Sequence, residues 1–122
     1  MEELIARLVA NVGVDRVAAE KSVGIILGFL VKEGPPDKAQ ALIDRLPGAQ
    51  ALLEAQQAGD ADGGMFSMGG LMGAGTKMMA LGLSMGQVQG VTKEVIAYSR
   101  EKAGEDAIGE IVGAIPGLSQ FV

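Results

Sequence analysis

The residues best suited to chemistry in this chain are the carboxylates of Glu101, Glu105, Asp106 and Glu110. They surround one predicted helix junction, and paired carboxylates are candidates for general acid–base catalysis. Such catalysis needs a cleft that shifts their pKa values, and nothing in the surrounding sequence indicates one. A solvated helix start explains all four, so we expect no catalytic residue here and no enzymatic activity.

A second acidic group, Asp60-Ala61-Asp62-Gly63, is similar to the start of a calcium-binding loop. That loop needs a third oxygen ligand at position five, glycine at six and glutamate at twelve. Counted from Asp60, these positions hold Gly64, Met65 and Leu71. The pattern fails, and we interpret residues 59–64 as a Gly-rich linker.

The glycines before Thr76 and Lys77 invite comparison with a phosphate-binding loop. In that motif Lys precedes Ser or Thr, and the loop follows a strand. Here Thr76 precedes Lys77, and no strand is predicted upstream. We therefore expect no nucleotide or other cofactor.

Methionines form the remaining candidate site, because several of them lie near one face of a predicted helix. Thioethers are soft ligands that suit Cu(I), but the chain has no Cys or His to complete a metal site. Methionine more often serves as adaptable packing. The third interpretation is an apolar contact surface for a partner helix or apolar ligand, with candidate residues Met65, Met68, Leu71, Met72 and Met79.

Composition disfavours several further classes of protein. The 122 residues contain no Cys and no His, which removes disulfides, thiol nucleophiles, Cys-type zinc sites and the commonest general base. The net charge of −5 and the scattered basic residues disfavour binding to nucleic acid or anionic membrane. No uninterrupted apolar run reaches the roughly 20 residues of a membrane span, and no secretory signal is seen. We therefore expect a cytoplasmic protein without stable membrane insertion.

Apolar periodicity and turn signals predict an all-α protein, a compact bundle of about seven or eight helices in one domain, 1–122. Its expected helices cover 2–12, 16–33, 37–46, 48–58, 66–81, 85–103 and 105–114, followed by a short last turn. The first helix carries one apolar stripe, Leu4, Ile5, Leu8, Val9 and Val12.

The helix over 16–33 is apolar nearly all round from Ser22 onward, which is typical of a buried helix. Asp15 is expected to cap its start, and Gly34 to end it in the left-handed conformation. Ser84 and Gln87 have the spacing of a capping box for the helix over 85–103.

The chain also contains an internal repeat, 1–58 and 70–122, with a constant offset of 69 residues. Gly13 aligns with Gly82, Asp37 with Asp106, and Pro47-Gly48 with Pro116-Gly117. We expect the two halves to pack about a pseudo-twofold axis, because neither half alone looks able to close a core. The more apolar helix 16–33 should be the central one, so Val95→Asp should do less damage than Ile26→Asp.

The turn and packing motifs resemble those of the VcgC/VcgE-like family of uncharacterised bacterial helical proteins. The matching segments are Val12-Gly13-Val14-Asp15, Gly24-Ile25-Ile26-Leu27, Leu46-Pro47-Gly48, Gly69-Gly70-Leu71 and Leu81-Gly82-Leu83-Ser84. The Gly-rich segment and the L-G-L-S turn are also similar to those of YidB-like proteins. The resemblance implies an all-helical fold and a bacterial source, and it implies no activity. The extra Ile115-Pro116-Gly117 departs from the family pattern.

Two hypotheses of function follow from the sequence. The first is a non-catalytic interaction or structural protein that forms a homo-oligomer or binds a protein partner. The alternative is a binder of an apolar small molecule or lipid, which would occupy a Met-lined pocket between the two halves. The Met/Gly-rich segment over 65–82 serves as contact surface in the first hypothesis.

Overall fold

The computed structural model describes residues 2–46, 48–60 and 70–115, with the backbone alone for residues 36, 55–60 and 70–74. The described residues form seven α-helices and no strand, which confirms the all-α prediction. The helices are α1 (Glu2–Asn11), α2 (Arg16–Glu33), α3 (Pro36–Arg45), α4 (Ala49–Asp60), α5 (Gly70–Ala80), α6 (Met85–Ala103) and α7 (Glu105–Ala114).

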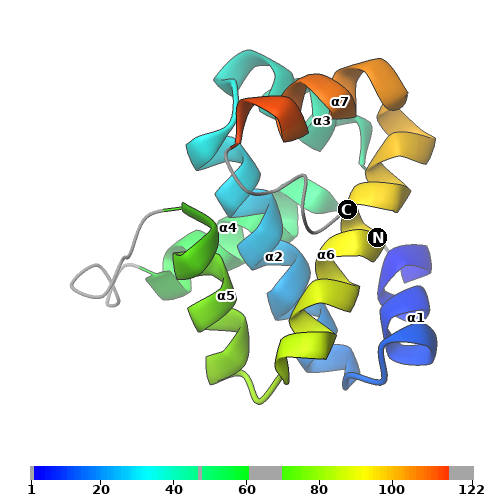
Figure 1. Cartoon of the computed structure of the whole chain (residues 1–122), viewed down its shortest axis with the longest axis vertical. Coiled ribbons are helices and arrows are strands. Elements are labelled where there is room, and N and C mark those ends of the chain that lie inside the picture. The colour runs from blue at the N-terminus through cyan, green and yellow to red at the C-terminus, as the bar shows by residue number, and fades with distance from the viewer. Residues whose placement is uncertain (1, 47, 61–69, 116–122) are drawn as a thin grey trace.

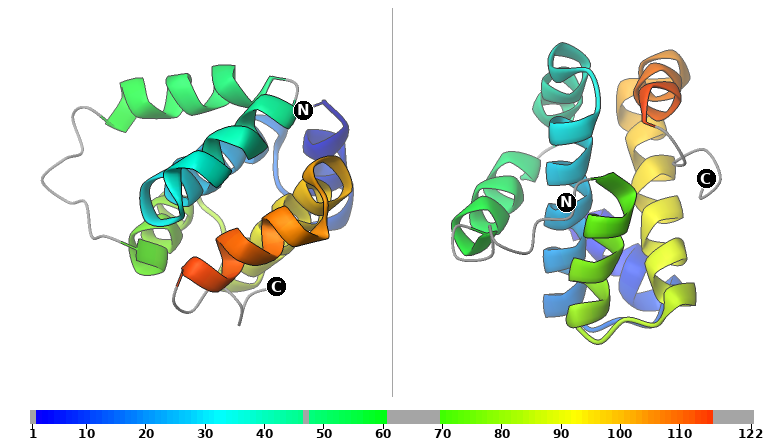
Figure 2. Two further views of the ribbon diagram at one scale, coloured as in Figure 1. Left: turned by 90° about the horizontal axis from the view of Figure 1, so that it is seen from above. Right: turned by 60° about the vertical axis from the view of Figure 1, so that its left-hand side comes forward.

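The two long helices, α2 and α6, form the middle of the bundle and run side by side in the same direction (Figure 1, Figure 2). Helices α1 and α5 each contact both of them. Helix α4 packs on α2, and α3 and α7 lie against each other at the end where α2 and α6 finish (Figure 1). Each long helix is therefore packed by helices from both ends of the chain.

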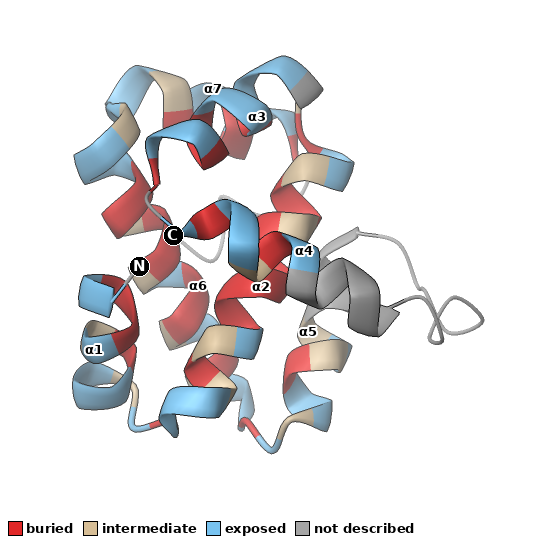
Figure 3. Ribbon diagram, turned by 180° about the vertical axis from the view of Figure 1, so that it is seen from behind, coloured by how far each residue is buried: buried red, intermediate tan, exposed pale blue. Residues whose placement is uncertain are grey.

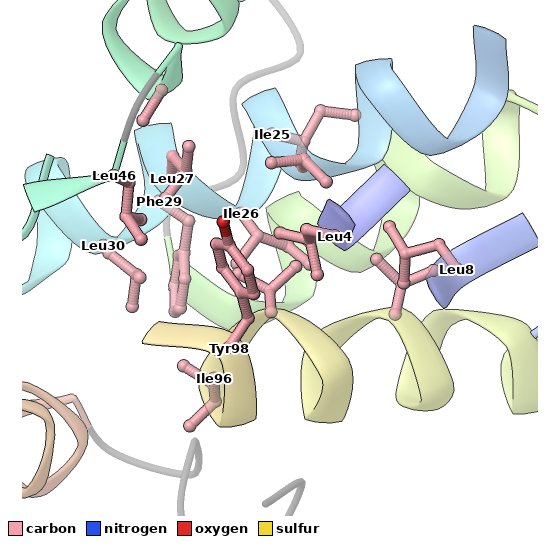
Figure 4. Close-up of a cluster of buried hydrophobic side chains, with 14 of the residues drawn as sticks. Leu4, Leu8, Ile25, Ile26, Leu27, Phe29, Leu30, Leu46, Ile96 and Tyr98 are labelled. Carbon is pink, nitrogen blue, oxygen red and sulfur yellow. The ribbon is translucent and has the colours of Figure 1, made fainter. Parts of the chain in front are cut away.

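The core lies along the inward faces of these helices, where Figure 3 colours the buried residues red. Tyr98 of α6 reaches toward Ile26 of α2, and Leu4 of α1 lies beside them (Figure 4). All three are at most 3% exposed. Side chains distant in the sequence thus fill one common core.

The predicted burial of α2 is confirmed, because every residue from Ser22 to Leu27 is buried. The expected difference in depth between the two long helices is not found at the positions chosen to test it. Val95 is 0% exposed and Ile26 is 2% exposed. The polar residues Thr92 and Ser99 make α6 look less buried in the sequence than it is in the structure. Their hydroxyls donate to backbone carbonyls four residues earlier and can therefore be buried.

The helix ends mostly follow their predicted signals. Gly13 and Gly82 have φ of +83° and +98°, a conformation that favours glycine. Ser84 and Gln87 make both bonds of the capping box. Asp15 occupies the N-cap position of α2, but its side chain makes no capping hydrogen bond.

Gly34 does not adopt the predicted left-handed conformation, because its φ is −88°. A different constraint requires glycine there. A Cβ at this position would lie 2.7 Å from the Leu30 carbonyl oxygen and 3.4 Å from the side chain of Ile111. The close approach to the backbone of the last turn of α2 explains this glycine, and the Ile111 side chain of α7 lies at ordinary van der Waals distance.

One predicted boundary and one predicted core position differ from the structure, and parts of other predicted elements lie outside the described residues. Helix α4 continues to Asp60, so the first two residues of the predicted linker 59–64 are helical and the others lie outside the described residues. Helix α5 covers Gly70–Ala80, and residues 66–69 of the predicted helix lie outside that description, as does the predicted last turn. Val9 belongs to the expected apolar stripe of α1, but it is exposed.

The buried hydroxyl of Ser22 gives a first testable prediction. Its Oγ has no hydrogen-bond partner among the residues that the structure describes, and an unpaired buried polar group costs about 1–3 kcal/mol. We expect Ser22→Ala to raise the free energy of unfolding in urea by about 1 kcal/mol. Ser99→Ala is the matched control and should lower it, since the Ser99 hydroxyl donates to the Val95 carbonyl over 2.7 Å. Equal losses in both variants would contradict the prediction.

Candidate functional site

The predicted contact surface falls on α5 and on the residues before it. Met65 and Met68 lie outside the described residues, and for Leu71 and Met72 the structure describes only the backbone of α5. Met79 is 47% exposed, whereas its neighbour Met78 is 1% exposed and belongs to the core. Of the predicted surface, Met79 is thus the member whose side chain is seen to face solvent.

The carboxylates at the junction of α6 and α7 are all exposed, as a solvated helix start requires. Glu101 accepts a hydrogen bond from Arg7 at 2.7 Å, and Glu110 pairs with Lys38 of α3. Glu105 and Asp106 open α7, where carboxylates are favoured by the helix dipole. These contacts join α1 to α6 and α3 to α7.

The described side chains include no group of three or more acidic, Cys or His residues placed to hold a metal ion. Within the described ranges, no helix is long and apolar enough to cross a membrane. The acidic segment from Asp60 onward lies almost wholly beyond those ranges.

Exposed apolar side chains gather at one end of the bundle. Among the described side chains, four large hydrophobic ones are exposed: Val9 (41%), Val17 (62%), Met79 (47%) and Met85 (55%). They belong to the last turns of α1 and α5 and to the first turns of α2 and α6. Figure 1 and Figure 2 show that these turns all lie at the end opposite α3 and α7. We call these four residues the apolar end.

Local geometry explains why these four side chains stay outside the core. The links 12–15 and 81–84 turn the chain through Gly13 and Gly82 at this end, and in the described part of the chain no further helix lies beyond the adjoining turns. Val14 and Leu83 of the same links are buried. Val17 and Met85 are apolar residues in the first turns of their helices, which the other described helices leave uncovered. That position was the signal in the sequence, and neither residue was predicted from it.

A groove of about 380 Å³ lies between α1 and α6. Asn11 and Val12 line it on the α1 side, and α6 contributes Gly90, Lys93, Glu94, Ala97 and Arg100. Val12 lies close over α6, because a Cβ on Gly90 would come within 3.2 Å of it. We call this feature the α1–α6 groove, and it contains no methionine.

Arg7 organises the charges along the α1–α6 contact. Its guanidinium bonds Glu94 at 3.2 Å and Glu101 at 2.7 Å, and its Cζ lies 5.9 Å from the centre of the Tyr98 ring. The hydrogen bond to Glu101, opposed by burial, raises the pKa of Arg7. A second network joins α1 to α2, where the hydrogen bond from Arg16 lowers the pKa of Glu2.

Comparisons with protein families, with curated proteins and with solved structures find no match for this chain.

Proposed function

We propose that this chain is a non-catalytic interaction protein that self-associates through its apolar end. The observation that carries the proposal is that the helix turns carrying the exposed Val9, Val17, Met79 and Met85 lie at one end of the bundle. Large exposed apolar patches mark interaction sites, and these four side chains belong to helix turns at the same end. Met79 also belongs to the contact surface predicted from the sequence.

The side chains of the apolar end favour contact with a second copy of the chain over contact with a charged partner. Val9 and Val17 are apolar and β-branched, and Met85 and Met79 are flexible, so together they can adapt to a second apolar surface. A second copy of the chain supplies such a surface by symmetry. Four side chains make a small interface, which is typical of weak and reversible contacts. We therefore expect association only at high chain concentration.

We further propose that the bundle consists of two similar halves related by a pseudo-twofold axis, and the helix bounds support this arrangement. Helices α2 and α6 begin at residues 16 and 85, and α3 and α7 cover 36–45 and 105–114, so the bounds keep the offset of 69. Helix α1 contacts α2 and α6, α5 contacts α6 and α2, and α3 contacts α7. Exchanging the halves leaves these contacts unchanged, whereas the contact of α3 with α6 has no counterpart of similar extent between α7 and α2. The apolar end is where both halves place their equivalent turns.

The alternative is an apolar ligand held in a Met-lined pocket between the halves. No observation on the described side chains favours it, since Met79 faces solvent and Met78 packs in the core. The resemblance to VcgC/VcgE-like proteins and a cytoplasmic location stay predictions, which rest on turn motifs and on the absence of a long apolar run.

The ε-methyl groups of methionine test the proposal directly in solution. On dilution from millimolar to micromolar chain, the methyl resonances of Met79 and Met85 should shift as the contact dissociates. Met78 is the matched internal control, because it is adjacent in sequence and buried at 1% exposure, and its resonance should stay in place. Unchanged Met79 and Met85 resonances, or equal shifts at all three methyls, would count against self-association through this end.

A further inference from the structure

We propose that the α1–α6 groove binds an acidic segment of a protein partner through two carboxylates. The groove, about 380 Å³, falls in the size range of small binding sites. Its lining combines a small apolar part, Val12, Gly90 and Ala97, with the side chains of Lys93 and Arg100. This site is separate from the apolar end and does not rest on the self-association proposed above.

Two cations line the groove, and neither has an ion-pair partner among the described residues. Lys93 and Arg100 are exposed, and neither makes an ion pair or hydrogen bond within the described ranges. Glu94 lines the same groove, but its carboxylate is held by Arg7 at 3.2 Å. Two cations are therefore available in a chain whose net charge is −5, and carboxylates are the groups that complement them.

The spacing of the two cations indicates the form of the ligand. Lys93, Ala97 and Arg100 follow one another at intervals of four and three residues, so they share one face of α6. Seven residues of α-helix separate Lys93 from Arg100 by about 10 Å along the axis. Three residues of polyproline II helix span about 9 Å, a similar distance, and place residues i and i+3 on the same side. A segment of the form Glu-x-x-Glu in this conformation, lying along α6, brings one carboxylate to each cation.

Titration of the folded, isotope-labelled protein with short blocked peptides tests this inference. Acetyl-Glu-Ala-Leu-Glu-amide should shift the backbone amides of Gly90 and Ala97, and the Gln-Ala-Leu-Gln counterpart should not. Micromolar protein keeps the chain below the range in which the apolar end would associate. Inorganic phosphate serves as the second probe, because a nonspecific anion site would bind it equally well.

Matched variants separate the groove from general electrostatics. The pair Lys93→Gln and Arg100→Gln should weaken binding of the glutamate peptide about tenfold. The control pair Lys21→Gln and Lys32→Gln removes the same charge from exposed positions of α2, and it should change the affinity less than about twofold. Absence of shifts at the groove, equal weakening by both pairs, or equal shifts with phosphate or the glutamine peptide would each overturn the proposal.

Discussion

Ile26→Asp and Val95→Asp are both expected to unfold the protein, with losses of about 5 kcal/mol each. Both side chains are buried, at 2% and 0% exposure, so either aspartate would place a carboxylate in the apolar core without a partner. A loss of this size is comparable with the whole stability of a small domain, about 5–15 kcal/mol. Circular dichroism and urea unfolding measure the effect.

Val17→Asp is the matched control for these two core variants. Val17 is 62% exposed, and exposed substitutions change stability by about 0.5 kcal/mol or less. It is the same change of valine to aspartate as at Val95, so the comparison isolates burial. A folded Val95→Asp variant with near-normal stability would contradict the assignment of α6 to the common core.

The two halves of the chain are expected to be unfolded when they are made separately and to fold when they are mixed. Helix α1 packs on α6 as well as on α2, and α5 packs on α2 as well as on α6. A fragment of residues 1–60 would therefore expose the buried face that α2 turns toward α5 and α6. The fragment 61–122 would likewise leave α6 without α1 and α2. Exposing this much apolar surface removes most of the driving force for folding.

Circular dichroism of each fragment and of their equimolar mixture measures this effect. Each fragment alone should show little helix and no cooperative unfolding, and the mixture should recover both. The intact chain provides the reference for full recovery. Cooperative unfolding of either fragment alone would contradict the interlocked packing of the two halves.

Local signals in the sequence predicted most of the helices. The bounds of α2, α6 and α7 agree with those predicted from Gly, Ser and Pro punctuation. The role of Gly34 could not be predicted, because it depends on how closely the chain leaving α2 approaches the Leu30 carbonyl oxygen. The full burial of Val95 was not predicted, because the nearby Thr92 and Ser99 are polar residues. In the structure their hydroxyls donate to backbone carbonyls of the same helix.

The candidate sites could be predicted from the sequence to a smaller extent than the helices, because they depend on how the helices pack. Met79 was predicted as a surface residue from its neighbours in the sequence, but Val17 and Met85 join it only because two turns bring four helix ends together. In the sequence, Lys93 and Arg100 are two of ten basic residues scattered along the chain. Their shared groove arises from the packing of α1 on α6, which periodicity within one helix cannot predict.

Sedimentation equilibrium of the wild-type chain and of the Val17→Asp/Met85→Asp double variant tests self-association most directly. The wild-type mass should rise with concentration from the 12.5 kDa monomer toward twice that value. The double variant should remain a folded monomer at every concentration, because it places two charges in the apolar end. A wild-type chain that stays monomeric at millimolar concentration, or a variant that associates equally well, would contradict the proposed function.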